Sequence, residues 1–194
     1  ADGEYTTLTW SGNNLLYLTT SLSDGTALTR AYYTYDTSNR LSTVTVDLSP
    51  NDQSKADANI YSTTHTYDGT SKRIASIAET DGTLLQIAYD GSGRVTSLVQ
   101  TVENGVTRTT TISYGSNKTT IFDAYSQATV LDFDAAGQLT RIQSPPALAG
   151  GTAQVVQFAY NANGDVLSMT DGGGKVTAYS YDANGNLLQE RDPA

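Results

Sequence analysis

Apolar and polar residues alternate along most of the chain with a period of two, which is the spacing of an extended strand. In 106–114, for example, Ile112 and Tyr114 fall on one face, while the intervening threonines and Ser113 fall on the other. No window of ten or more residues carries the 3.6-residue stripe of an amphipathic helix. The pattern therefore predicts an all-β chain of about 14 to 16 strands, well above ordinary strand content. The clearest strands are expected at 5–10, 15–22, 27–35, 41–47, 60–67, 73–80, 84–89, 95–102, 106–114, 128–133, 138–143, 154–160, 175–181 and 186–191.

A seven-residue motif recurs where one predicted strand ends and the next begins. Its clearest copy is 181–187, YDANGNL. An aromatic residue ends a strand, an Asp follows, two small or polar residues form the bend, and a Gly, a polar residue and an apolar residue lead into the next strand. The start-to-start spacings of the copies run from 19 to 32 residues, which is typical of stacked repeats. The other copies lie at 10–16, 35–41, 67–74, 89–95, 114–121, 133–139 and 160–166.

Each position of this motif has a physical reason. An Asp or Asn directly after a strand can accept a hydrogen bond from the backbone two residues on, and so form an Asx-turn. Gly and Asn at the fifth position tolerate a left-handed backbone, and an aromatic residue suits a half-buried pleated surface. The structural residues predicted for these turns are Trp10, Asn14, Tyr35, Asp36, Asn39, Tyr67, Asp68, Tyr89, Asp90, Gly93, Phe133, Asp134, Gly137, Tyr160, Asn161, Gly164, Tyr181, Asp182 and Gly185.

A second kind of turn is predicted at the opposite ends of the strands. Asp-Gly pairs at 24–25, 81–82 and 171–172, and the Asn-Gly pair at 104–105, each lie between two β-prone runs, which is a strong hairpin signal. One repeat is thus two strands and two turns. Two longer loops, 48–59 and 144–153, break this rhythm and hold three of the four prolines. We interpret them as surface insertions; the alternative is a contact site for another part of a parent protein.

The repeated motif resembles the YD repeat, also called the RHS repeat. The segment 160–187, YNANGDVLSMTDGGGKVTAYSYDANGNL, carries the resemblance best, and the first 60 residues follow it loosely. This family occurs in bacterial RHS and polymorphic toxins, in toxin-complex components of insect pathogens and in animal teneurins. The resemblance implies tandem β-hairpins in one long, curved or spiralling antiparallel sheet. In the toxins such a sheet forms a shell around a toxin or effector segment.

The repeats run from one end of the chain to the other, which predicts a single YD/RHS-repeat domain over 1–194. Leu187 is followed five residues later by Asp192, in the same phase as Val166 and Asp171. We therefore expect the chain to be a fragment of a larger array, with 186–191 as an open edge strand. The resemblance also implies a secreted or cell-surface protein, bacterial in origin, whose export signal lies outside this chain.

Composition narrows the function classes. Asp and Glu number 20 against 11 Lys and Arg, a net charge of −9, which argues against nucleic acid and anionic membrane surfaces as partners. Sixteen of the 20 acidic residues are Asp, a turn-favouring residue, so many turns account for the acidity. There is no cysteine, and the longest apolar run is far below the roughly 18 residues that a membrane span needs.

Candidate catalytic and metal-binding residues are few. His65 is the only histidine and is interpreted as an ordinary strand residue, since no partner for a catalytic triad can be placed. Asp132 and Asp134 alternate along one predicted strand and could share a cation, but regular turn use explains them better. The glycine run 171–175 lacks a phosphate-binding fingerprint, and 117–119 matches a glycosylation sequon by pattern alone. We expect no catalytic residue, no cofactor and no metal.

The aromatic residues leave two functions open. There are 13 Tyr, 3 Phe and 1 Trp, mostly at strand ends with the spacing of the repeat. They are interpreted as a structural ladder, which favours a non-catalytic shell-wall module whose partners are the rest of its parent protein and possibly an enclosed toxin or effector segment. The alternative is a carbohydrate-binding or adhesive module in which exposed rings stack on a glycan.

Overall fold

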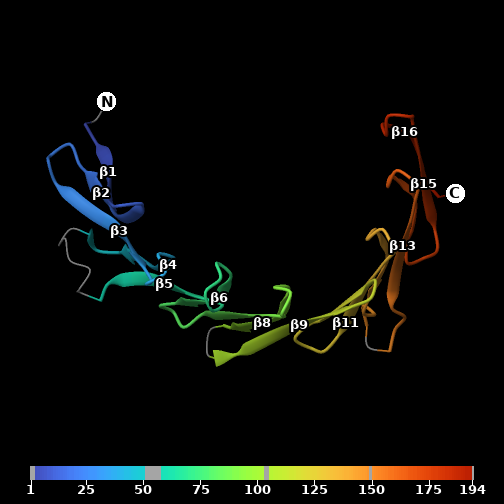
Figure 1. Cartoon of the computed structure of the whole chain (residues 1–194), viewed down its shortest axis with the longest axis horizontal. Coiled ribbons are helices and arrows are strands. Elements are labelled where there is room, and N and C mark those ends of the chain that lie inside the picture. The colour runs from blue at the N-terminus through green and yellow to red at the C-terminus, as the bar shows by residue number, and fades with distance from the viewer. Residues whose placement is uncertain (1–2, 51–57, 103–104, 149, 194) are drawn as a thin grey trace. The chain divides into compact units, whose positions relative to one another are not determined.

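The computed structural model describes residues 3–50, 58–102, 105–148 and 150–193, which form sixteen β-strands and no α-helix (Figure 1). Every strand is hydrogen-bonded to its neighbours in the chain, so the strand order runs from β1 to β16 without a crossover, and the pairings are antiparallel. No described residue belongs to a helix that is long and apolar enough to cross a membrane. The strands are β1 Tyr5–Ser11, β2 Asn14–Ser21, β3 Ala27–Tyr35, β4 Leu41–Asp47, β5 Ile60–Tyr67, β6 Ile74–Glu79, β7 Leu84–Tyr89, β8 Val95–Thr101, β9 Thr107–Gly115, β10 Lys118–Phe122, β11 Ala128–Phe133, β12 Leu139–Ser144, β13 Gln154–Tyr160, β14 Val166–Thr170, β15 Val176–Tyr181 and β16 Leu187–Arg191.

This architecture confirms the predicted all-β fold of tandem hairpins in an antiparallel sheet. The sequence reading did not specify two of the strands, β10 and β14, and both are only five residues long. The first of them lies within 114–121, where the sequence pattern predicts a copy of the turn motif. Gly115 and Lys118 pair with each other there, so the actual loop consists of the two residues between them. Residues assigned to a turn therefore already belong to a strand.

The chain divides into two compact units, Ala1–Arg108 and Thr109–Ala194. The first contains β1 to β8, and the second contains most of β9 together with β10 to β16. In each unit the strands form one layer, with the hairpin loops at the strand ends (Figure 1). The single domain expected over 1–194 stays a prediction.

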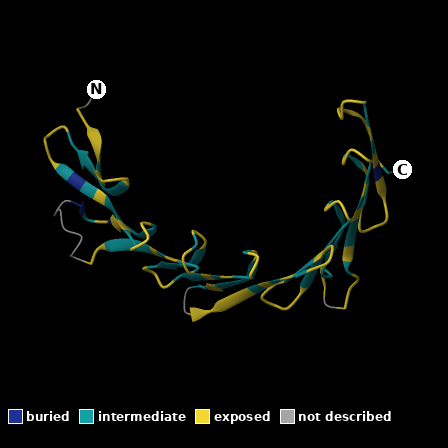
Figure 2. Cartoon of the chain, viewed as in Figure 1, coloured by how far each residue is buried: buried dark blue, intermediate teal, exposed yellow. Residues whose placement is uncertain are grey.

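Neither unit has a conventional core. Leu28 of β3, which is 4% exposed, is the one buried hydrophobic residue in the described part of the chain. Figure 2 shows that the strands are largely half-buried and that most loop residues are exposed. Cross-strand side-chain pairs and the hydrogen bonds of the loops must therefore supply much of the stabilisation that a packed interior supplies in a two-layer domain.

The two faces of the sheet differ in the first unit. Register places Val44 opposite Thr63, Ile77 opposite Leu85 and Ile87 opposite Leu98 on one face. Hydroxyl pairs occupy the other face, because successive residues of a strand point to opposite sides. Thr45 and Ser62 are joined by a 2.9 Å hydrogen bond, and Thr66 and Ser76 by one of 2.6 Å.

The second unit repeats this division with charged groups on the polar face. Ile142 lies opposite Val156, and Phe158 opposite Met169, on the apolar face. On the other face Asp132 of β11 accepts a 2.9 Å hydrogen bond from Arg141 of β12 and lies 3.5 Å from the Lys118 ammonium of β10. The three residues occupy facing register positions, so they form a short ionic row across three strands.

Candidate functional site: the row of aromatic-Asp turns

The hairpin loops share one backbone plan. In the loop 90–94, the Asp90 amide donates to the Arg94 carbonyl at 2.9 Å, and the Gly93 amide donates to the Asp90 carbonyl at 2.9 Å. Gly93 has a φ of 79°. Next to the loop, the pairing of β7 with β8 shifts register between Ala88 and Tyr89, as expected for a turn that is followed by a bulge in the second strand. Ten loops in the described part of the chain combine the same two bonds with a positive φ at the fourth position; they begin at Leu22, Asp36, Glu79, Asp90, Val102, Asp123, Asp134, Asn161, Asp171 and Asp182.

The two predicted kinds of turn therefore share one backbone conformation and differ in the loop position of the acidic residue. In most loops that follow an aromatic residue, the first residue is an Asp or Asn. In the loop 22–26 the first residue is Leu22, and Asp24 at the third position accepts a 2.8 Å bond from the Thr26 amide. Asp81 does the same for Thr83.

The loop predicted at the Asp-Gly pair 171–172 carries its acid at the first position. The Asp171 carboxylate accepts bonds from the Gly173 and Lys175 amides at 2.8 and 2.9 Å. The residue in the left-handed region is Gly174, with a φ of 81°. This loop thus has the backbone conformation and first-position Asp of the aromatic-Asp loops, although it follows Thr170 and lies at the opposite ends of the strands.

Five of the predicted acidic or amide residues make identical contacts. In each case one side-chain oxygen accepts bonds from the backbone amides two and four residues on, all at 2.9 Å; the residues are Asp36, Asp90, Asp134, Asn161 and Asp182. The fourth loop positions lie at φ 61° for Asn39, 79° for Gly93, 82° for Gly137, 93° for Gly164 and 82° for Gly185. The loop after Tyr67 is one residue longer, so the Asp68 main-chain amide donates to the carbonyl of Arg73, and the left-handed residue is Gly69.

At Asn14 the expected left-handed backbone is absent. Gly12 has the positive φ, 59°, and Asn14 is already the first residue of β2, paired with Ser11 at the end of β1. Gly12 at the first of only two loop positions allows a tighter turn, so the fifth position of the motif falls in the strand. The Asn14 side-chain nitrogen Nδ2 donates instead to the side-chain oxygen Oδ1 of Asn39 in the next aromatic-Asp loop.

The tyrosines of the motif join neighbouring repeats. Four of their hydroxyls donate to a main-chain carbonyl near the start of the strand that follows an earlier turn. The bonds run from Tyr35 to Leu15 at 3.0 Å and, at 2.7 Å each, from Tyr67 to Leu41, Tyr89 to Ile74 and Tyr160 to Leu139. Their rings are half-buried, and Phe133 occupies the corresponding place without a hydroxyl. The aromatic position is thus a tie between repeats.

In several of the aromatic-Asp loops the last residue reaches the next loop along the same edge of the sheet. The Arg40 guanidinium pairs with Asp36 at 2.8 Å, donates to the Gly69 carbonyl at 2.9 Å and to the Ser71 carbonyl at 2.5 Å, and lies 4.3 Å from the centre of the Tyr67 ring. Arg73 likewise pairs with Asp68 and lies 5.0 Å from the centre of the Tyr89 ring.

These reaching side chains lie against the left-handed glycines. A Cβ at Gly93 would collide with the Arg73 guanidinium, and one at Gly164 would lie 3.0 Å from the Gln138 amide nitrogen. One at Gly185 would lie 3.7 Å from a carboxylate oxygen of Asp165. Sequence reasoning missed this role, because the last loop position varies among Arg, Gln and Asp, whose side chains share only their polarity.

The loop geometry also sets the electrostatics of the row. The main-chain amides of Arg40 and Arg94 are the largest causes that lower the pKa of Asp36 and of Asp90 from the ordinary 3.8. For Asp182 the main cause of the lowered pKa is the hydrogen bond from the Asn186 side chain. Tyr61, away from the row, has its pKa raised to about 12 because its hydroxyl donates to the Glu79 carboxylate at 2.6 Å.

The described residues offer little for catalysis or metal binding. None of them forms a group of three or more His, Asp or Glu side chains that could hold a metal ion. His65 is half-buried in β5 opposite Ile77, and its Nδ1 has no hydrogen-bond partner, so no carboxylate orients the ring through that nitrogen. Asp132 and Asp134 do not share a site, since the first belongs to the ionic row and the second closes its own loop.

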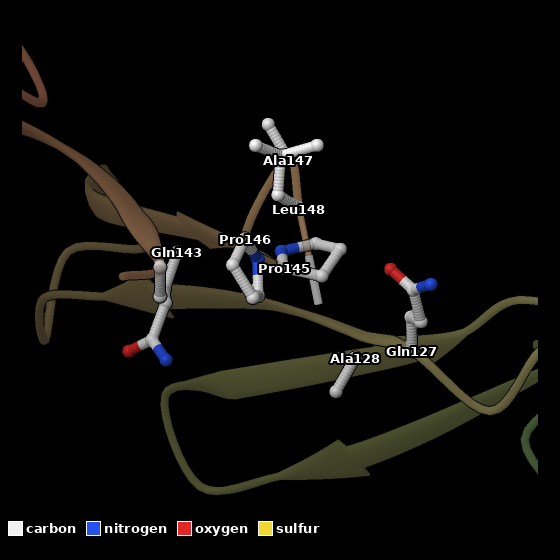
Figure 3. A pocket seen from close by; sticks show the side chains of 8 residues that line it. Gln127, Ala128, Gln143, Pro145, Pro146, Ala147 and Leu148 are labelled. Atoms are coloured by element: carbon white, nitrogen blue, oxygen red, sulfur yellow. The ribbon is translucent and has the colours of Figure 1, made fainter. Parts of the chain in front are cut away.

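A pocket of about 410 Å³ lies beside the 145–148 segment, between it and the ends of β11 and β12 (Figure 3). Pro145, Pro146 and Leu148 line it together with the amide side chains of Gln127 and Gln143. The whole lining is uncharged, so this pocket contains no acid, base or nucleophile for a reaction. The turn row, rather than a cleft, is the most organised feature of the molecule.

Comparison with known proteins confirms the resemblance noted in the sequence. The family model RHS Repeat matches residues 160–194. No curated protein with a similar sequence was found. Among solved structures, the chain is similar to crystal structures of TcdB2-TccC3-Cdc42 and TcdB2-TccC3, each with a TM-score of 0.63 and 12% identity over 98% and 97% of this chain. The Tc holotoxin pore of Photorhabdus luminescens aligns with a TM-score of 0.61 and 12% identity over 97% of this chain.

At this level of identity the similarity establishes the fold alone. The chain spans 12% of the length of each of these three structures. The described residues therefore have the sheet architecture of a segment of these Tc assemblies.

The tie between repeats can be tested at Tyr160. Tyr160→Phe removes the bond to the Leu139 carbonyl but keeps the ring, so it should lower the free energy of unfolding by about 0.5–1.5 kcal/mol. Tyr160→Ala also removes half-buried ring area and should cost about 2–3 kcal/mol. Urea denaturation measures both. Equal losses for the two variants would contradict a separate contribution from the ring, and no loss for Tyr160→Phe would contradict the tie.

The contact between successive loops can be isolated with matched glycines. Gly93→Ala and Gly82→Ala both place a Cβ at positive φ, 79° and 89°, and each should cost about 1 kcal/mol of strain. Only the first displaces Arg73 from the Tyr89 ring, because nothing lies within 4 Å of a Cβ at Gly82. Gly93→Ala should therefore cost about 0.5–1 kcal/mol more. In an Arg73→Ala background the two costs should become equal; a persisting difference would mean that the loops do not couple.

Lowering the pH should reduce the stability that the turn row provides. The lowered pKa of Asp90 means that its contribution to stability is complete above its unfolded pKa and is lost as the pH falls through the folded value. We expect urea midpoints that stay level from neutral pH to about pH 5 and fall below about pH 4. Asp90→Asn keeps an acceptor oxygen, as Asn161 has, but loses the carboxylate charge. Its loss of stability relative to the parent chain should therefore be visible at neutral pH and should shrink in acid. A deficit that grows in acid would contradict this assignment.

Proposed function

We propose that this chain is a non-catalytic wall segment of an RHS/YD-repeat shell, in a larger secreted or cell-surface bacterial protein, and that the shell encloses or presents a toxin or effector segment. The observation that carries this proposal is the row of aromatic-Asp loops, the turn row. Four of these loops end in a side chain that reaches the next loop: Arg40, Arg73, Gln138 and Asp165. A row of this kind extends by adding repeats, which suits a wall.

The absence of a conventional core supports a structural role as part of an array. Each hairpin exposes both faces and makes its main contacts with the hairpins on either side. Repeat proteins of this kind gain stability from nearest-neighbour interfaces, so they serve well as extended scaffolds. The fold shared with the Tc structures points the same way. We propose one repeat domain over 1–194 that belongs to a longer array, with the rest of the array and an enclosed segment as its partners.

A catalytic role finds no support among the described side chains. His65 lacks an orienting carboxylate, and the Tyr61 hydroxyl stays protonated beside Glu79. Nucleophilic or acid-base catalysis needs such groups to be positioned together and tuned in pKa. We therefore assign no enzymatic activity to the segment.

The carbohydrate-binding alternative is not favoured. Its ligand would stack on tyrosine rings at repeat spacing, but the hydroxyls of Tyr35, Tyr67, Tyr89 and Tyr160 are bonded to main-chain carbonyls. Arginine side chains also lie over the rings of Tyr67 and Tyr89. These tyrosines already contact neighbouring strands and loops of the sheet, so their rings are poorly placed to stack on a sugar.

The proposal can be tested in the full-length parent protein by limited proteolysis of the segment that it would enclose. We expect that segment to resist protease in the intact protein and to become sensitive when Tyr160→Ala weakens the tie between repeats. Ala183→Ser, at an exposed loop position, is the matched control and should leave the protection unchanged. Equal cleavage in the intact protein and in the Tyr160→Ala variant would contradict enclosure. Saturable glycan binding that is lost with Tyr160 while the fold persists would favour the adhesive alternative.

A further inference from the structure

Two of the aromatic-Asp loops place an asparagine directly before the left-handed glycine. These pairs are Asn163-Gly164 and Asn184-Gly185, and both asparagines are exposed. An Asn-Gly pair is chemically reactive, because glycine has no side chain to hinder its own amide nitrogen from approaching the asparagine side chain. The folded loop decides whether that approach can occur.

We propose that Asn163 and Asn184 are sites of spontaneous deamidation that the closed loop suppresses, and that Asn184 is the faster of the two. In this reaction the backbone nitrogen of the glycine attacks the asparagine Cγ. The new N–Cγ bond replaces the Cγ–Nδ2 bond, and Nδ2 leaves as ammonia with the proton of the glycine amide. Water then opens the cyclic imide at either carbonyl and yields aspartate or isoaspartate. No oxidant or reductant is involved.

The closed loop suppresses the attack through bonds that hold both reacting groups. The Gly185 amide donates to the Asp182 carbonyl at 3.1 Å, which directs it away from the Asn184 side chain. The Asn184 amide donates to the Asp182 carboxylate at 2.9 Å and restrains the backbone between the two residues. The same two bonds bind Gly164 and Asn163 to Asn161. The loop must therefore open before the nitrogen can reach Cγ.

The side chains that reach the two loops distinguish the sites. A Cβ at Gly164 would lie 3.0 Å from the Gln138 amide nitrogen, whereas one at Gly185 would lie 3.7 Å from a carboxylate oxygen of Asp165. Gln138 therefore lies more tightly against its loop than Asp165 does. Local opening is easier where weaker contacts must break, so the loop at Asn184 should open more often.

The two products affect the loop differently. An aspartate at the third position is already accommodated elsewhere, since Asp24 and Asp81 occupy that position and accept a bond from the amide two residues on. Isoaspartate adds a methylene to the main chain between the third and fourth positions. The longer main chain no longer matches the bond between the fourth-position amide and the first-position carbonyl, so the isoaspartate product should keep the loop open.

Peptide mapping by mass spectrometry tests the proposal on the 194-residue chain held in mildly alkaline buffer, with and without concentrated urea. We expect conversion of Asn184 to be about ten-fold or more slower in the folded chain than in urea. Asn184 should convert before Asn163 in the folded chain, and the two should convert at similar rates in urea. Equal rates with and without urea, or faster conversion of Asn163 in the folded chain, would overturn the proposal.

Two variants at the first loop position separate gating from general unfolding. Asp182→Ala removes the acceptor of the Asn184 amide and should speed conversion at Asn184 while Asn163 stays slow. Asp182→Asn keeps that acceptor, as Asn161 does, and should leave the rate near that of the parent chain. An unchanged rate in a folded Asp182→Ala chain would contradict gating by the loop. Should Asp182→Ala unfold the chain, both sites would accelerate together, and the Asp182→Asn chain compared with and without urea would still decide.

Discussion

The main-chain bond that closes each five-residue loop is the constraint on which the rest of the structure depends. An amide at the fourth position can donate to the first carbonyl and still lead into the bulge only if that fourth residue adopts a left-handed conformation. Gly93, Gly164 and Gly185 meet this requirement without strain, and Asn39 does so with a short polar side chain. Because the loop fixes the register of its two strands, it also determines where the next tyrosine and the next loop will lie. The contacts between repeats follow from this local geometry.

With so little buried apolar surface, the sheet gains specificity from directed polar contacts. The Tyr89 hydroxyl reaches one particular carbonyl, and Arg40 is shared between its own Asp36 and the carbonyls of the next loop. Such contacts are individually modest, and their strength lies in repetition. The arrangement also explains why the faces can differ. Apolar side chains pack across strands on one face. On the other face, hydroxyl pairs and the ionic contacts of Asp132 satisfy the polar side chains without a second layer.

The sequence reveals the fold well because the repeat is built from local signals. Strand alternation, the Asp after the aromatic and the Gly at the left-handed position are all short-range features, and they predicted the hairpins correctly. Contacts between residues far apart along the chain could not be read in the same way. Nothing in the sequence shows that Arg40 reaches Ser71, or that Gln138 packs against Gly164. Asn14 was assigned to the left-handed position wrongly, because the neighbouring Gly12 could meet the same backbone requirement. The short strand β10 was hidden because a two-residue loop replaced the usual five.

The sequential strand order has a mechanical consequence. Every strand pairs with strands that precede or follow it directly in the chain, so no segment is trapped beneath another. A pull on one end would peel the sheet hairpin by hairpin, with force rising and falling once per repeat, instead of rupturing a whole domain at one moment. The same connectivity lets each hairpin form as soon as its neighbour exists, so the array can assemble progressively as the polypeptide emerges.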